Sequence, residues 1–278
     1  MTYEIQQVEA EVLQQDLVEK ANVDIQVTTA KRFPRNLARV RDNSIALVTM
    51  DKETASSCSY ALPRGGKPIT GPSVHLARIL AQQYGNIRAE ARVVNITDTE
   101  VVSRGTAWDL ENNYAVAFEV RRSIVGRSGR FSNDMITVTG NAANAISYRN
   151  AVLSIIPKGI VDAAYNAAQN LVTGDLSSEE KLIARRTKAI KHFNDEYGIT
   201  EDEILKLIGK HTVAQIKVNE IQVLLGMEQS LKDGDTTVEE LLKDIRTVAE
   251  DASKAKNAYE AKSKAESKKD KKENLFNE

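Results

Sequence analysis

Hydrophobic and polar residues recur with two different periods along the chain, and the change of period predicts where helices give way to strands. Between residues 4 and 22, apolar side chains recur at a roughly helical spacing among many Gln and Glu, which predicts an acidic N-terminal helix. Residues 73–85 have the amphipathic pattern of a second helix, with Ser73 as its N-cap and Gly85 as its stop.

From residue 87 the period falls to two, as expected for strands. Residues 87–94, 101–108 and 114–121 each alternate outward and inward positions, and Tyr114 and Phe118 share one face of the third segment. The links between these segments are short. The pattern therefore predicts a three-stranded antiparallel β-meander with one packed face and one face exposed to water.

Helical periodicity returns after the meander. Residues 133–156 predict one long helix, ended by Pro157, that covers the apolar side of the sheet, and residues 160–171 predict another. A β-meander followed by covering helices is an α+β core. Further short amphipathic segments predict a small helical bundle, and the last residues combine dense charge with few apolar side chains, which is typical of frayed helix or disorder.

These changes divide the chain into four segments. We expect an acidic N-terminal helix over residues 1–28, a basic α+β core over 29–175, a helical module over 176–249 and a charged tail over 250–278. Inside the core, residues 59–72 are rich in Pro and Gly and predict turns. Pro34 is expected in the first turn of a helix that would place Arg35, Arg39 and Asp42 on one face.

Charge is distributed unevenly, although the whole protein carries a net charge of only −1. Fourteen of the 17 arginines fall between Lys31 and Lys158, so that residues 1–30, 31–158 and 159–278 carry net charges of −5, +8 and −4. The central segment favours arginine, whereas the last segment favours lysine. Because guanidinium is planar and forked, it suits phosphates and stacked bases, so a polyanion, foremost nucleic acid, is the predicted partner.

The candidate site consists of basic side chains on the predicted sheet, the turn-rich arm, a glycine-rich loop and the covering helix, together with Phe131 in that loop as a base-stacking group. These residues are Arg64, Lys67, Arg88, Arg92, Arg121, Arg122, Arg127, Arg130, Phe131, Arg149 and Lys158. Cross-strand pairing with Glu90 or Glu119 is the open alternative for the strand arginines. Trp108 and Tyr148 are expected in the core rather than on a stacking platform.

Other chemistry finds little support in the sequence. RGGK at residues 64–67 lacks both the spacing and the following Ser or Thr of a Walker loop. His75, His192 and His211 have no second His or Cys at ligand spacing, and Cys58 is expected to be a buried thiol. We therefore expect a protein that is not an enzyme and has no catalytic residues, metal or cofactor. No membrane span or secretory signal is apparent, and we expect a cytoplasmic protein.

Three stretches carry a resemblance to a known group of proteins. SYALPRGGKPITGPSVHLARILAQQYGN, WDLENNYAVAFEVRR and NDMITVTGNAANAISYRNAVLSIIPK resemble phage and prophage single-strand DNA annealing proteins. Their broader superfamily includes RecT, the lambda Red beta protein, Erf and the eukaryotic Rad-type annealing proteins. The resemblance covers about residues 30–172, and the ITEDEILKLIG and LKDGDTTVEELL segments resemble C-terminal helical modules of phage recombination proteins.

The resemblance implies ATP-independent binding and annealing of single-stranded DNA by an oligomeric ring or filament with a basic groove. The partners it implies are single-stranded DNA, the annealed duplex intermediate and further copies of the chain, and the location is the host cytoplasm if the protein is phage-encoded. The terminal segments would serve assembly or recruit a phage exonuclease or a host single-strand-binding protein. A structural phage protein with a basic patch and an unrecognised nuclease remain open alternatives.

Overall fold

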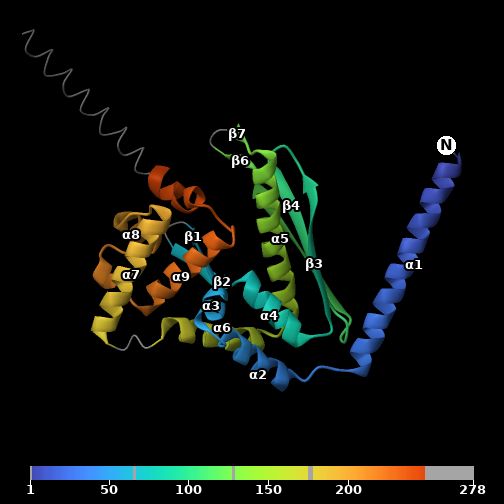
Figure 1. The fold of residues 1–278 in the computed structure, drawn as a ribbon, viewed down its shortest axis with the longest axis horizontal. Coiled ribbons are helices and arrows are strands. Elements are labelled where there is room, and N and C mark those ends of the chain that lie inside the picture. The colour runs from blue at the N-terminus through green and yellow to red at the C-terminus, as the bar shows by residue number, and fades with distance from the viewer. Residues whose placement is uncertain (1, 65–66, 127–128, 175–177, 248–278) are drawn as a thin grey trace, which may run out of the picture.

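A computed structural model describes residues 2–64, 67–126, 129–174 and 178–247. Its centre is a three-stranded antiparallel sheet in the order β3-β4-β5, built from β3 (Ile87–Ile96), β4 (Glu100–Asp109) and β5 (Tyr114–Ser123). Helix α5 (Asn133–Ile155) crosses one face of this sheet (Figure 1). The predicted α+β class, the meander and its covering helix are thus confirmed, with strand ends that differ from the prediction by at most two residues.

The contact between α5 and the middle strand is unusually close. A Cβ atom on Gly105 would lie only 2.2 Å from the backbone oxygen of Ser147, so no larger residue fits at this crossing without moving the helix. One step along the strand, the Ser103 hydroxyl bonds with Asn144 Oδ1 at 2.6 Å and with Ser147 Oγ at 2.8 Å. These bonds satisfy the polar groups buried between helix and sheet.

Around this layer pack α2 (Leu37–Val48), α3 (Lys52–Ser57), α4 (Val74–Tyr84) and α6 (Lys158–Thr173). Their buried side chains form one cluster with the C-terminal part of α5. Leu76, Leu80 and Val152 belong to this cluster. Ser73 accepts a bond from the Leu76 backbone and Gly85 ends the helix, both as predicted. Cys58 is fully buried in the same cluster, and burial raises the pKa of its thiol to about 12.

The Pro- and Gly-rich segment before α4 is a β-hairpin rather than the predicted run of turns. Strands β1 (Ser59–Arg64) and β2 (Lys67–Pro72) pair antiparallel with Tyr60 opposite Gly71. The Tyr60 ring lies against the Gly71 backbone, where a Cβ would approach it to 2.8 Å. Pro63 and Pro68 face each other in a two-stranded ribbon that has no inner strand, so their missing N–H groups are tolerated.

The C-terminal module contains α7 (Glu179–Tyr197), α8 (Glu201–Leu207), the short 3-10 helix η1 (Val213–Gln215), α9 (Val218–Lys232) and a helix over residues 238–247. Its apolar cluster includes Ala61 of β1, so the hairpin and the module share a core. Helix α9 lies directly on β1: a Cβ on Gly226 would meet the Tyr60 carbonyl carbon at 2.9 Å, and Ser230 Oγ bonds with the Ala61 backbone. Residues 250–278, predicted as a charged tail, lie outside the described residues.

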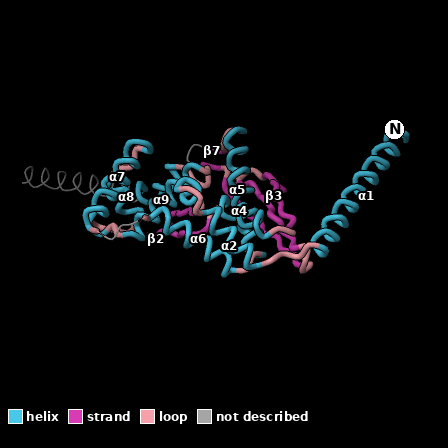
Figure 2. Tube along the Cα trace, turned by 60° about the horizontal axis from the view of Figure 1, so that its bottom comes forward, coloured by secondary structure: helices cyan, strands magenta, loops and turns pink. Residues whose placement is uncertain are grey.

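The N-terminal helix, α1 (Thr2–Arg32), extends four residues beyond the predicted segment 1–28 and stands away from the rest of the molecule (Figures 1 and 2). Near its C-terminal end only Ala30 is buried. The expectation that Pro34 and Arg35 lie inside the next helix is wrong, because Asn36 is the N-cap of α2 and its side chain accepts a bond from the Arg39 backbone. Arg35 therefore lies in the connection between α1 and α2.

Arg35 fixes that connection to the lower end of the sheet. Its guanidinium donates to both carboxylate oxygens of Asp109 at 2.7 Å, lies 3.1 Å from Glu111 and sits 3.8 Å from the centre of the Tyr84 ring. Its Nη2 also donates to the backbone oxygens of Gly85 and Asn86. The side chain is only 6 % exposed, so this arginine is a structural clamp at the root of α1 rather than a surface charge.

The clamp makes stability depend on acid pH. Burial alone would raise the pKa of Asp109, but bonds from Arg35 and Asn112 outweigh it and lower the pKa to about 2. A depressed carboxyl pKa stabilises the fold above about pH 4, and this contribution is lost as the pH falls through the folded value. The shift corresponds to about 2 kcal/mol. In urea titrations from pH 7 to 2, we expect the stability difference between wild type and Asp109→Asn to narrow below about pH 5; a constant difference would contradict this.

Candidate nucleic-acid interface

The face of the sheet that points away from α5 carries a group of arginines. Strand β4 alternates between buried side chains on the α5 side and Arg104, Thr106 and Trp108 on the other. Its register places Arg92 of β3 and Glu119 of β5 on either side of Arg104, and it places Arg88 beside Trp108. Because side chains opposite one another in a ladder point to the same side, these residues share what we call the open face, together with Glu90, Ala115, Ala117 and Arg121.

Three of the four arginines on the open face form no ion pair with the described residues. Arg92, Arg104 and Arg121 are exposed, and no carboxylate of the described chain lies within ion-pair distance of them. Glu90, Glu100 and Glu119 share this face, yet none of them lies within ion-pair distance of these three guanidinium groups. Among the strand arginines on this face only Arg88 is paired, and its partner is Glu19 of α1, at 2.7 Å, rather than a carboxylate on a neighbouring strand.

A shallow depression lies in the middle of the open face. It is lined by the small residues Thr106, Ala115 and Ala117, by Trp108, and by the charged residues Arg88, Glu90 and Arg104. Trp108 is half-buried, and its Nε1 donates to Asn113 Oδ1 at 3.3 Å. The structure therefore corrects the expectation that Trp108 lies in the core, and it places an aromatic ring among the free arginines.

Helix α1 borders this face on the β3 side. A second depression lies between Arg88 and the α1 side chains Gln15, Val18, Asn22 and Ile25. Glu19 and Arg88, which form an ion pair, both line this depression. Away from its C-terminal end α1 diverges from the sheet (Figure 1), so the rest of the open face is uncovered by the described residues.

Basic residues near the hairpin form a separate group. Arg149 of α5 lies 4.3 Å from the centre of the Tyr60 ring, Lys67 is exposed at the start of β2, and Arg78 of α4 is exposed near Tyr148. Arg64 ends β1 opposite Lys67, but its side chain and residues 65–66 lie outside the described part. This group lies beside the hairpin and α4, on the α5 side of the sheet rather than on the open face.

Other predicted site residues serve packing in this structure. Arg122 points to the α5 side and donates to the Asp235 backbone oxygen at 2.6 Å and to Glu240 at 3.1 Å, which ties β5 to the C-terminal module. Phe131, expected as an exposed stacking group, is half-buried against the cluster of Val101 and Ile124.

The basic side chains of the glycine-rich loop and of the start of α6 also bond to nearby groups of the chain. Arg130 donates to the backbone oxygens of Thr97 and Asp98, which joins the small ribbon of β6 (Val125–Gly126) and β7 (Gly129–Arg130) to the β3–β4 turn. Lys158 pairs with Asp162 at 2.6 Å. Arg127 lies outside the described residues. The predicted site is thus divided, and Arg88, Arg92 and Arg121 are the members brought together on the open face.

Arg104 is the member of this face that sequence reasoning missed. It lies in the middle strand, two and four residues before Thr106 and Trp108. The same period-two pattern that grouped Arg88 with Arg92 would have placed it on the exposed side of the strand. The signal was present, because inward positions of this strand are apolar or small while Arg104 alternates with them.

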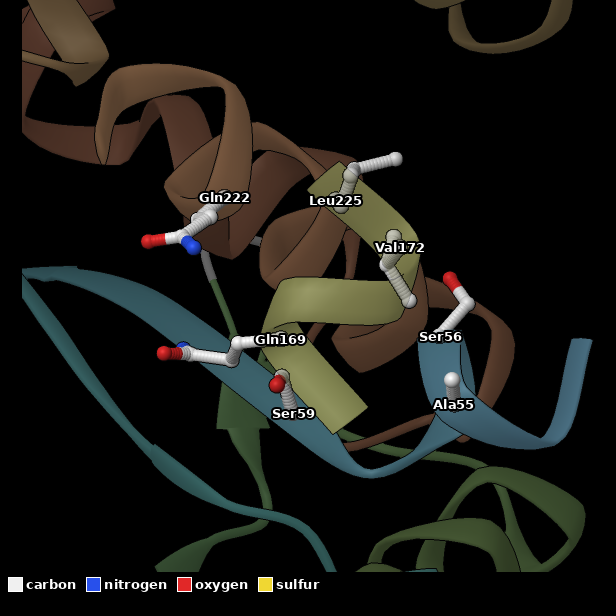
Figure 3. Close-up of a pocket in the computed structure, with 7 residues that line it drawn as sticks. All are labelled: Ala55, Ser56, Ser59, Gln169, Val172, Gln222 and Leu225. Atoms are coloured by element: carbon white, nitrogen blue, oxygen red, sulfur yellow. The ribbon is translucent and has the colours of Figure 1, made fainter. Parts of the chain in front are cut away.

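Other features of the described chain do not compete as ligand sites. A notch between α3, α6 and α9, lined by Ala55, Ser59 and Gln222 among others (Figure 3), has a volume of about 10 Å³, which is room for roughly one water molecule. No group of three His, Cys, Asp or Glu side chains in the described ranges is arranged to hold a metal ion. His75 bonds to Asp233 at 2.9 Å, and this bond raises the pKa of the imidazole.

The chain was also compared with known proteins. No protein-family model, curated protein or solved structure matches it. Within the described residues, no helix has the length and apolar character needed to cross a membrane.

Proposed function

We propose that this protein binds single-stranded DNA on the open face of its sheet and anneals complementary strands without ATP. The observation that carries the proposal is the set of three exposed, unpaired arginines, Arg92, Arg104 and Arg121, on one uncovered face with Trp108. Binding of single strands without sequence preference combines a cationic surface for the backbone with aromatic rings for the bases. The resemblance to phage annealing proteins supports the same function.

The geometry suggests how such binding would assist annealing. Guanidinium groups neutralise phosphates, which lowers the repulsion between two strands brought together. An open, shallow face leaves the base edges accessible to a second strand, whereas a closed channel would hide them. Stacking on Trp108 would contribute about 1–3 kcal/mol for one base, enough to order the strand locally. No step of this process needs nucleotide hydrolysis or a metal ion.

Mixing the protein with two complementary oligonucleotides tests the proposal. We expect faster duplex formation than with the oligonucleotides alone, in the absence of ATP, and a rate that falls as salt rises, because bound phosphates release counterions. Binding of each strand without acceleration would indicate a basic patch that only contacts DNA, as in a structural phage protein. Loss of the strands themselves would indicate a nuclease. Either result would overturn the annealing function.

A further inference from the structure

Helix α1 has the composition of a docking element but little to dock on within its own chain. Along residues 13–26 nearly all side chains are exposed, and Leu13, Leu17 and Ile25 each expose more than 60 % of their surface. Helices in proteins gain most of their stability from tertiary packing of an apolar face. A helix of 31 residues that stands away from the body therefore lacks the contact that its side chains suit.

The apolar residues of α1 form one continuous ridge. Leu13, Leu17, Ala21 and Ile25 recur at every fourth position, and such residues line up along one side of a helix and pack into a groove of another element. Val18, 55 % exposed, lies next to this ridge. The helix is acidic, since residues 1–30 carry a net charge of −5, and Asp24 lies directly beside the ridge.

The open face has the complementary character. Its depression is lined by the small side chains of Thr106, Ala115 and Ala117 and by Arg88, Arg104 and Glu90. The unpaired Arg92 and Arg121 lie elsewhere on the same face. An apolar ridge on an acidic helix fits a depression of small residues on a face with three unpaired arginines. The ion pair between Glu19 and Arg88 uses the opposite side of α1 and leaves the ridge free.

Within one chain the contact cannot extend further. The Arg35 clamp holds the root of α1 at the lower end of the sheet, and from there the helix diverges from the strands (Figures 1 and 2). A helix from another molecule is free of this constraint. We propose that α1 of one copy docks, by its apolar ridge and carboxylates, on the open face of a second copy.

This contact is heterologous, because the donor surface and the acceptor surface are different. Every copy offers one of each, so head-to-tail contacts continue into a ring or an open filament. The docking itself does not depend on the function proposed above. The consequence for DNA rests on the proposed function. The acidic helix and the DNA backbone would compete for the same arginines, so that DNA displaces α1 from the face.

Two variants separate donor from acceptor. Leu13→Gln with Leu17→Gln removes the ridge while keeping good helix formers at exposed positions, and Ala117→Glu fills the depression and adds a negative charge on an exposed strand position. By sedimentation velocity at low salt, we expect the full-length wild type to exceed monomer mass increasingly with concentration. Each variant should stay monomeric, and their equimolar mixture should form a one-to-one dimer that does not grow.

Any other outcome would contradict the docking of α1 on a second copy. A monomeric wild type would show that α1 has no partner copy, and assembly of Ala117→Glu alone would indicate helix–helix pairing of α1 with α1. A monomeric mixture would exclude the head-to-tail contact. Gln15→Ala with Gln26→Ala, on the other side of α1, is the control and should assemble as wild type does, and circular dichroism checks that all variants fold. Adding a thymidine oligonucleotide tests the competition separately, so that absent DNA binding leaves the mass measurements interpretable.

Discussion

Replacing Arg35 with alanine is expected to lower the free energy of unfolding by about 3–5 kcal/mol, because removal of one partner leaves a buried charge uncompensated. Asp109 would keep its carboxylate in a site that is only 3 % exposed and would lose both bonds from the guanidinium. The backbone oxygens of Gly85 and Asn86 would lose a donor as well. Urea denaturation followed by circular dichroism at pH 7 measures the change.

Arg39→Ala is the matched control for this prediction. Arg39 is four residues along the chain, exposed on α2, and only its backbone N–H takes part in capping. We expect its free energy of unfolding to stay within about 0.5 kcal/mol of wild type. If Arg35→Ala behaved like Arg39→Ala, this clamp would not hold the root of α1, and α1 would be free to reach its own sheet.

Replacing Arg92, Arg104 and Arg121 together with glutamine is expected to reduce affinity for a single-stranded oligonucleotide by roughly 100-fold or more, since a charged hydrogen bond contributes about 1.5–3 kcal/mol. The dependence on salt should weaken too. Each phosphate contact on a single strand adds about 0.7 to the slope of log affinity against log salt, so the slope should fall by about 2. Fluorescence anisotropy at several salt concentrations gives both quantities.

A second triple variant makes the same change in net charge elsewhere. Arg39, Lys52 and Lys188 are exposed on α2, α3 and α7, and their replacement by glutamine should leave the affinity within a few-fold of wild type. Equal losses in the two variants would mean that DNA responds to the net charge of the protein rather than to the open face. If only the replacement of Lys67, Arg78 and Arg149 weakened binding, the DNA site would instead lie at the basic group near the hairpin.

The period of apolar residues was enough to predict the centre of the fold. Alternation along 87–121 predicted the meander and the side of the sheet that α5 covers, because strand side chains alternate strictly between faces. Tyr114 and Phe118 point to that side, as predicted, but both are exposed. The long apolar pattern after Asn133 gave α5, and Ser73 and Gly85 gave the limits of α4. These signals are local, so they can be recognised without knowledge of the rest of the molecule.

Features decided by distant contacts could not be predicted in this way. Pro63 and Pro68 indicate turns, yet α9 packs on this segment and supports it as a hairpin. Arg35 looks like any other cation near a helix start, and only the fold brings Asp109 and Tyr84 to it. Tertiary packing regularly overrides local propensity in such segments.

The candidate site could be predicted only where the local pattern along a strand decides which way a side chain points. Period two placed Arg88 and Arg92 on one side of a strand, and it would have placed Arg104 with them. Charge alone did not distinguish Arg122, whose partners Asp235 and Glu240 follow more than 100 residues later. Nor did it show that Phe131 would pack against Ile124 rather than face the solvent. Charge counts therefore identified a basic segment, while the sheet register defined its surface.

Trp108 offers the most direct test of the open face as the DNA site, because it is the only tryptophan of the chain and lies among the free arginines. Titration with a single-stranded oligonucleotide should quench or shift its emission, with the same midpoint as binding followed by anisotropy, and added salt should reverse the change. Oligonucleotide binding that leaves Trp108 emission unchanged, or no binding at low salt, would contradict the account.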